Sequence, residues 1–179
     1  MATRAEIQRV VAQLLRALRI DGPPVPVERV AAHLGARVHY EYFDGDLSGF
    51  LVREQNRTII GVNSRHAATR RRFTIAHEVG HLLLHDQDRL HFDRRFPIRL
   101  RDTRSSQAVD PDEIAANAFA AELLMPTAMV QRDLAAHTVD YEDEESLRSL
   151  AGRYNVSLQA MILRLVNLGY IDQDIDLRP

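Results

Sequence analysis

The chain has 179 residues, of which 45% are hydrophobic and 27% charged, a composition typical of a soluble globular fold. Its 23 basic and 25 acidic side chains give a formal net charge of −2. This excludes a strong overall electrostatic attraction to nucleic acids or membranes. There is no Cys, so disulfides, a thiolate nucleophile and Cys-ligated zinc are excluded, and a metal site would have to use His and carboxylate.

Two helices are predicted at the N-terminus. Apolar residues recur at helical spacing over residues 3–19, which indicates an amphipathic helix. Pro26 suits a first helical turn and Gly35 a C-terminal cap, so a short helix is expected over residues 27–34. Charged residues interrupt the first twenty positions, and no apolar run approaches the roughly 18 residues that span a bilayer. We therefore expect a cytoplasmic protein without a secretion signal or membrane anchor.

Three short segments have the composition of β-strands. They cover residues 37–43, 49–53 and 58–62, and turn-forming or polar residues separate them at Asp44-Gly45-Asp46 and at residues 54–57. Their short connections predict a small three-stranded sheet.

The centre of the chain is predicted to be helical on both sides of a long loop. Apolar residues cover most of the circumference of a helix over residues 67–85, which indicates that it is largely buried. Residues 86–110 are rich in Arg and are predicted to form a basic connecting loop. Two further helices follow at residues 112–124 and 127–136, separated by Pro126.

An acidic stretch at residues 140–145 is the best candidate for a domain boundary. Beyond it, residues 146–170 predict two helices around a turn at Tyr154-Asn155-Val156, with the apolar skeleton of a helix-turn-helix. We therefore expect an α+β fold, mostly helical with a small sheet. Residues 1–138 would form the main domain, and residues 139–179 a helix-turn-helix-like segment packed on it.

The five residues from His77 to His81 match the motif H-E-x-x-H. Residues i and i+4 lie one turn apart on the same helical face, so both imidazoles can reach one zinc ion. Glu78 lies about 100° around the helix, where it can hold and deprotonate a water molecule. The spacing predicts His77 and His81 as metal ligands and Glu78 as the general base.

A catalytic zinc ion takes three protein ligands and keeps one position open, so a third ligand is needed. His85 extends the i, i+4 series but lies about 12 Å along the helix from His77, so we expect it to support the site rather than bind the metal. Glu113 is better placed near the start of the next helix, with Asn117 one turn later to orient a ligand. Glu122 competes with Glu113, yet it lies about 180° around that helix, so only one of the two can face the metal.

Two separated motifs resemble the ImmA/IrrE metallo-endopeptidases. The first is RFTIAHEVGHLLLH at residues 72–85, and the second is EIAANAFAAELLMP at residues 113–126. The tetrapeptide SGFL at residues 48–51 is also similar to the family. The resemblance covers about residues 25–130.

This resemblance implies a compact zincin-like metallopeptidase in the main domain. It implies zinc held by His77, His81 and Glu113, with Glu78 as catalytic acid and base. Mn²⁺ is the alternative ion in the cell. Members of the family typically cleave or inactivate helix-turn-helix repressors of the XRE type. We therefore expect an endopeptidase that derepresses the genes of a repressor encoded nearby. The alternative is a non-proteolytic regulatory module that binds and sequesters a repressor or antitoxin.

Direct DNA binding by the C-terminal segment is not expected. Residues 141–179 hold four Arg and seven acidic residues, whereas phosphate contacts supply much of the affinity for DNA. A peptide substrate could pair with an exposed edge of the sheet. Tyr154, His91 and the Arg residues of segment 89–104 are candidates for stabilising the oxyanion.

Overall fold

A small sheet and seven helices make up the part of the chain that the computed structural model describes, which is residues 2–44, 47–54, 57–84, 90–93, 110–136 and 139–172. The helices are α1 (Arg4–Ala17), α2 (Val27–His33), α3 (Ala68–Leu84), α4 (Pro111–Leu124), α5 (Thr127–Ala136), α6 (Glu144–Tyr154) and α7 (Leu158–Leu168). They confirm the predicted helices, with small shifts at the ends. None of the described helices is long and apolar enough to cross a membrane.

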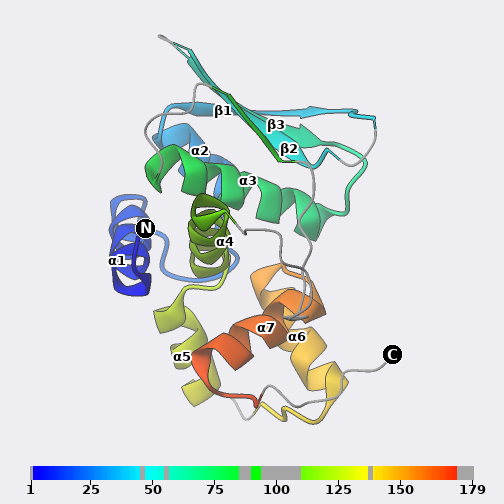
Figure 1. The fold of residues 1–179 in the computed structure, drawn as a ribbon. Helices are drawn as coiled ribbons and strands as arrows, with labels where there is room; N and C mark the ends of the chain where they lie inside the picture. Colours follow the sequence, from blue (N-terminus) through cyan, green and yellow to red (C-terminus); the bar gives the residue numbers. More distant parts are fainter. Residues whose placement is uncertain are drawn as a thin grey trace.

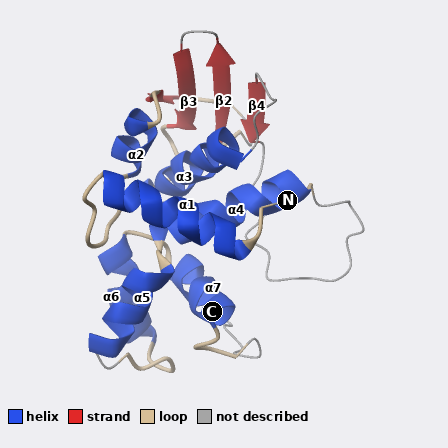
Figure 2. Cartoon of the chain, turned by 90° about the vertical axis from the view of Figure 1, so that its left-hand side faces the viewer, coloured by secondary structure: helices blue, strands red, loops and turns tan. Residues whose placement is uncertain are grey.

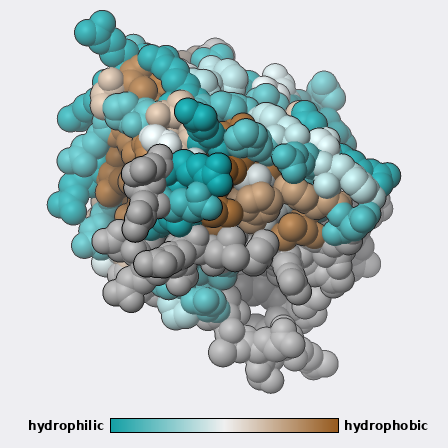
Figure 3. Space-filling model, turned by 90° about the horizontal axis from the view of Figure 1, so that it is seen from above, coloured by the Kyte–Doolittle hydropathy of each residue, from teal (hydrophilic) through white to brown (hydrophobic). Residues whose placement is uncertain are grey.

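The elements are arranged in three levels. The sheet lies at one end of the molecule, α1, α3 and α4 occupy the middle, and α5, α6 and α7 form a group at the other end (Figures 1 and 2). Hydrophilic residues predominate on the face seen from the sheet end, with hydrophobic patches between them (Figure 3). The α+β class predicted from the sequence is therefore confirmed.

Four strands form the sheet within the described residues. They are β1 (Ala36–Glu41), β2 (Gly49–Glu54), β3 (Arg57–Asn63) and β4 (Leu90–Asp93), in the order β1-β3-β2-β4. β1 is parallel to β3, and the other two pairs are antiparallel.

The sequence predicts three strands and a loop over residues 86–110, and this prediction is wrong for β4, which extends the sheet along β2. A strand of four residues is too short for an alternating pattern to stand out from an Arg-rich sequence. Hydrogen bonding to the backbone of β2, rather than any local pattern, makes this segment a strand.

Helix α3 lies directly beneath the sheet (Figure 1). It contacts β2 and β3 on one side and α4 on the other. Eight consecutive residues, from Thr74 to His81, are buried as a result. The prediction of a largely buried helix is confirmed.

Helix α4 packs against α3 at a glycine. A Cβ atom at Gly80 would lie 3.1 Å from Cα of Ala116 and 3.3 Å from Cβ of Phe119, so the two helices approach more closely than larger residues allow. The start of α4 is also defined locally, because the carboxylate of Asp110 accepts a hydrogen bond from the amide of Asp112 and Pro111 occupies the first turn.

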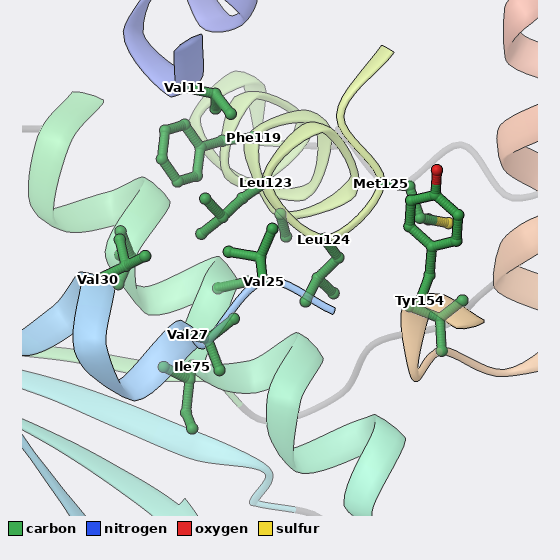
Figure 4. Close-up of a cluster of buried hydrophobic side chains, with 14 of the residues drawn as sticks. Val11, Val25, Val27, Val30, Ile75, Phe119, Leu123, Leu124, Met125 and Tyr154 are labelled. Atoms are coloured by element: carbon green, nitrogen blue, oxygen red, sulfur yellow. The ribbon is translucent and has the colours of Figure 1, made fainter. Parts of the chain in front are cut away.

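The hydrophobic core fixes how α3 and α4 lie relative to each other. Val11 of α1, Val30 of α2, Ile75 of α3 and Phe119 of α4 are buried and belong to one hydrophobic cluster (Figure 4). Protein interiors are close-packed, so a shift of either helix would open voids among these side chains. The core therefore positions the two helices that carry the candidate site.

Buried polar contacts tie the last three helices together and to α4. Arg164 of α7 donates a hydrogen bond to the carboxylate of Glu122 on α4. Tyr154 of α6 donates to the carboxylate of Asp133 on α5 at 2.8 Å. Asn155, in the left-handed region at φ 52°, ends α6, and α7 begins shortly after it, so the predicted pair of helices is confirmed. The division into residues 1–138 and 139–179 stays a prediction.

Candidate metal centre

Two histidines face each other on the buried part of α3. Nε2 of His77 and Nε2 of His81 are 2.9 Å apart, and the ring centroids are 4.6 Å apart. Both side chains are buried. The helical repeat explains this geometry, because residues four apart lie on the same face of the helix.

Glu113 reaches the same point from the first turn of α4. Its Oε1 lies 3.1 Å from Nε2 of His81, and its Oε2 lies 3.5 Å from Nε2 of His77. One ligand atom from each of the three residues lies within 4.8 Å of the others. Among the described residues, no other group of three or more His, Asp or Glu side chains could hold a metal ion.

The donors fit a catalytic zinc ion. Two imidazole nitrogens and a carboxylate are a ligand set that zinc takes in peptidases, and three protein ligands leave one position open. The side chain of His77 is fully buried, whereas that of Glu113 is 32% exposed. The cluster is therefore closed on the α3 side and accessible on the Glu113 side.

Asn117 fixes the orientation of the His77 ring. It lies one turn after Glu113 on α4, and its Oδ1 is 3.1 Å from Nδ1 of His77. An amide oxygen only accepts hydrogen bonds, so Nδ1 of His77 is the donor and carries the proton. The lone pair of the neutral ring is then on Nε2, the atom that faces His81 and Glu113.

Glu78 is fully buried beneath the beginning of β2. A Cβ atom at Gly49 would lie 3.7 Å from Oε1 of Glu78, 2.4 Å from Cγ2 of Thr74 and 2.7 Å from the carbonyl oxygen of Gly61. Only glycine fits at this point. The absence of a side chain at Gly49 therefore lets β2 pass close to the carboxylate of Glu78.

Glu122, the competing candidate for the third ligand, lies elsewhere. Its carboxylate accepts hydrogen bonds from the amide of Thr127 at 2.9 Å, from the hydroxyl of Thr127 at 2.8 Å, and from the guanidinium of Arg164. These contacts cap the beginning of α5 and hold α7. The structure thus brings Glu113 to the histidines and places Glu122 in a structural ion pair.

The candidate oxyanion donors do not join the cluster in the described residues. Tyr154 is fully buried beside Met125, and its hydroxyl donates to Asp133 (Figure 4). Burial and this hydrogen bond raise the pKa of the Tyr154 hydroxyl. Tyr154 is therefore a core residue, and its proposed role as an oxyanion donor is wrong. His85, Arg89, the side chain of His91 and residues 94–104 lie outside the described residues.

Sequence reasoning missed two arginines that join the sheet to α3. Nη2 of Arg53 on β2 donates to the carbonyl oxygen of His81 at 2.6 Å. Nη2 of Arg70 on α3 donates to the hydroxyl of the buried Ser48, 2.9 Å away. No sequence pattern marks these pairs, because each joins residues more than twenty positions apart.

A protein-family model covers the sequence of both helices that form this centre. The model of the IrrE N-terminal-like domain, a peptidase family, matches residues 31–166. A relative, the uncharacterized immunity region protein 2 of Bacillus phage phi105, is 26% identical over 126 residues, which cover 70% of this chain and 72% of the phage protein. The family match includes His77, His81 and Glu113 and confirms the resemblance stated from the two motifs. The chain therefore belongs to the metallopeptidase family of the IrrE N-terminal-like domain.

Proposed function

We propose that this chain is a zinc-dependent endopeptidase that cleaves a helix-turn-helix repressor of the XRE type and so derepresses the genes that the repressor controls. The observation that supports the peptidase activity most directly is the cluster of His77, His81 and Glu113, whose ligand atoms lie within 4.8 Å of one another. Glu78 is buried next to His77 on the same helix. This combination provides three ligands and a separate carboxylate for proton transfer.

A repressor is our choice of substrate for two reasons. Proteins of the ImmA/IrrE type, which the two sequence motifs resemble, typically act on such repressors. The phage relative is named for an immunity region, which favours a regulatory protein over a nutrient protein as the target of this chain. Because a repressor acts on DNA, we place the reaction in the cytoplasm.

Zinc is the ion we assign to the three ligands, with Mn²⁺ as the alternative in the cell. Imidazole and carboxylate donors bind both ions, and zinc is the ion most often held by two histidines and a glutamate in peptidases. When bound, the ion supplies Lewis-acid polarisation of the scissile carbonyl group. The protein holds the three donors together and closes the cluster on the α3 side, which leaves the Glu113 side accessible.

Glu78 is the proton carrier in this proposal. Its carboxylate removes a proton from the attacking water molecule and then gives that proton to the nitrogen of the leaving amine. The close passage of β2 at Gly49 restricts where the carboxylate can lie. Asn117 keeps His77 in the tautomer that presents Nε2 to the cluster.

The test is incubation of the purified protein and Zn²⁺ or Mn²⁺ with a helix-turn-helix repressor encoded beside it. We expect one discrete cleavage by the native protein and none by Glu78→Gln, which keeps the ligands and removes the base. If the repressor stays intact and loses DNA binding equally with both proteins, the chain acts by sequestration and the enzymatic proposal fails for that partner.

A further inference from the structure

A groove of about 560 Å³ runs between α3, α4 and α7. Phe73 of α3 and Asn117 of α4 line it, and both also contact His77. The ring centroids of Phe73 and His77 are 6.4 Å apart, and Asn117 is hydrogen-bonded to His77 at 3.1 Å. Asn117 contacts Nδ1 of His77, whereas Nε2 faces the ligand cluster, so the His77 ring and these wall residues lie between the groove and the cluster.

One wall of the groove comes from α7, the second helix of the helix-turn-helix-like pair. Gln159, Leu163 and Asn167 lie at intervals of four residues on α7 and line the groove. In a DNA-binding helix-turn-helix, the exposed face of the second helix reads the major groove. Here this face is directed towards α3 and α4, and Arg164 of the same helix is buried in an ion pair with Glu122. The helix pair thus forms part of a protein groove.

The surface of the groove suits apolar side chains. Ala118 and Ala121 of α4 line the groove together with Leu163 of α7. Because the alanine side chains are small, they leave room for a bound side chain beside the backbone of α4. The amides of Gln159 and Asn167 add a few groups that can hydrogen-bond to a peptide backbone. A largely apolar groove of a few hundred Å³ with a small number of polar groups is typical of a ligand site.

The charge of the groove determines which peptides it would bind. None of the described residues that line the groove is acidic. Of its two arginines, Arg164 is neutralised by Glu122, whereas the exposed Arg70 donates to the neutral hydroxyl of Ser48 at 2.9 Å. The groove therefore carries one positive charge that a bound carboxylate could complement.

We propose that this groove, which we name the α4–α7 groove, binds the segment of the protein substrate next to the scissile bond, and that it selects an apolar side chain with an acidic residue close to it. The inference rests on the proposed function, since it assumes that a polypeptide is cut at the neighbouring metal centre. It identifies the chemical class of sequence that the peptidase recognises.

The test is the binding of three labelled peptides to the zinc-loaded Glu78→Gln variant, measured by fluorescence anisotropy. One peptide is rich in Leu and Glu, the second in Leu and Lys, and the third in Ser and Glu. We expect the Leu/Glu peptide to bind at least about tenfold more tightly than the other two. Equal binding of the three peptides, or no binding of any, would overturn the groove assignment.

Two pairs of variants place the binding in the groove. Ala118→Leu fills it and should weaken binding of the Leu/Glu peptide about tenfold, whereas Ala128→Leu, an exposed helical alanine outside the groove, should not. Arg70→Glu should reverse the preference so that the Leu/Lys peptide binds better, and Arg71→Glu should leave the preference unchanged. A purely structural role of Arg70 would lower all affinities without this reversal. Equal effects within each pair would refute the proposal.

Failure of this inference can be told apart from failure of the proposed function. Cleavage of the repressor by the native protein and not by Glu78→Gln would establish the peptidase whatever the peptides do. If the native protein binds the Leu/Glu peptide in the groove but leaves the repressor intact, the groove assignment stands. The proposed function then fails for that repressor.

Discussion

The amide oxygen of Asn117 lies 3.1 Å from Nδ1 of His77, one turn of α4 beyond Glu113. One helix thus provides both a carboxylate that faces the cluster and an amide that orients a ring on the neighbouring helix. Because both contacts depend on how closely α3 and α4 approach, the metal affinity should report on the packing of these helices.

Removing the amide should weaken the metal site without removing a ligand. For Asn117→Ala we expect zinc affinity to fall by about 10–100-fold, because the His77 ring loses the hydrogen bond that fixes its tautomer. Competition with a chromophoric chelator measures this. Asn117→Asp keeps an acceptor oxygen at the same place and should restore most of the affinity, and failure of this rescue would contradict the assigned role.

The helix contact at Gly80 gives a second prediction. Gly80→Ala places a methyl group 3.1 Å from Cα and 3.2 Å from the carbonyl oxygen of Ala116, so α4 must move away and Glu113 with it. We expect a measurable loss of zinc affinity. Gly152→Ala on α6 is the control, because nothing lies within 4 Å of its new Cβ and the change should stabilise the helix by about 0.5–1 kcal/mol. Equal zinc affinity in the two variants would show that this contact does not position Glu113.

The sequence predicts the parts of this centre that depend on local geometry. The spacing of His77 and His81 predicts their common direction because it depends only on the helical repeat. The choice between Glu113 and Glu122 also follows helical phase, and the structure places the two carboxylates in different surroundings. By contrast, the ion pair of Glu122 with Arg164 joins residues 42 positions apart and has no local signal.

A similar limit applies to the sheet and to Tyr154. β4 owes its conformation to the backbone of β2, and its four residues carry too little pattern to predict it. Tyr154 is a polar aromatic residue in a turn region, which is compatible with a surface role until its contact with Asp133 is known. In both cases tertiary contacts decide the outcome.

The same substitution at the two glutamates of α4 should affect different quantities, the zinc affinity at Glu113 and the stability of the fold at Glu122. Glu113→Gln removes a charged ligand and should lower zinc affinity while leaving the unfolding free energy of the metal-free protein nearly unchanged. Glu122→Gln leaves Arg164 buried beside a neutral group and should destabilise the fold by roughly 3 kcal/mol with little effect on zinc affinity per folded molecule. Urea unfolding and chelator competition measure the two quantities. The reverse pattern would make Glu122 the third ligand.

Metal content offers a direct test of the histidines. The protein purified without chelator should hold about one zinc ion per chain, and His77→Ala or His81→Ala should remove it. His33→Ala, which changes an exposed histidine of α2, is a control that should keep the ion, and His85→Ala should keep most of it. Full zinc occupancy in both the His77 and His81 variants, measured by elemental analysis, would end the assignment.

The C-terminal helices should not confer DNA binding on the isolated protein. Arg164 of α7 is held by Glu122, and the outward-reading side chains of this helix line the α4–α7 groove instead. We expect no sequence-selective, salt-sensitive binding to DNA from the protein's own upstream region. Anisotropy titrations at several salt concentrations test this, and a tight complex with a strongly negative salt slope would favour a direct transcription regulator.

His81 and Glu113 belong to two helices that are far apart in the chain, so an ion held by both acts as a removable cross-link as well as a reagent. In the unfolded chain, the intervening segment would have to close into a loop to bring these ligands together, and this costs conformational entropy. The ion therefore binds the folded form selectively, and its binding free energy adds to the stability of the fold. Each tenfold rise in free zinc above the dissociation constant should raise the unfolding free energy by about 1.4 kcal/mol. For this molecule a chelator is then a mild denaturant, and the thermal midpoint becomes a measure of metal supply.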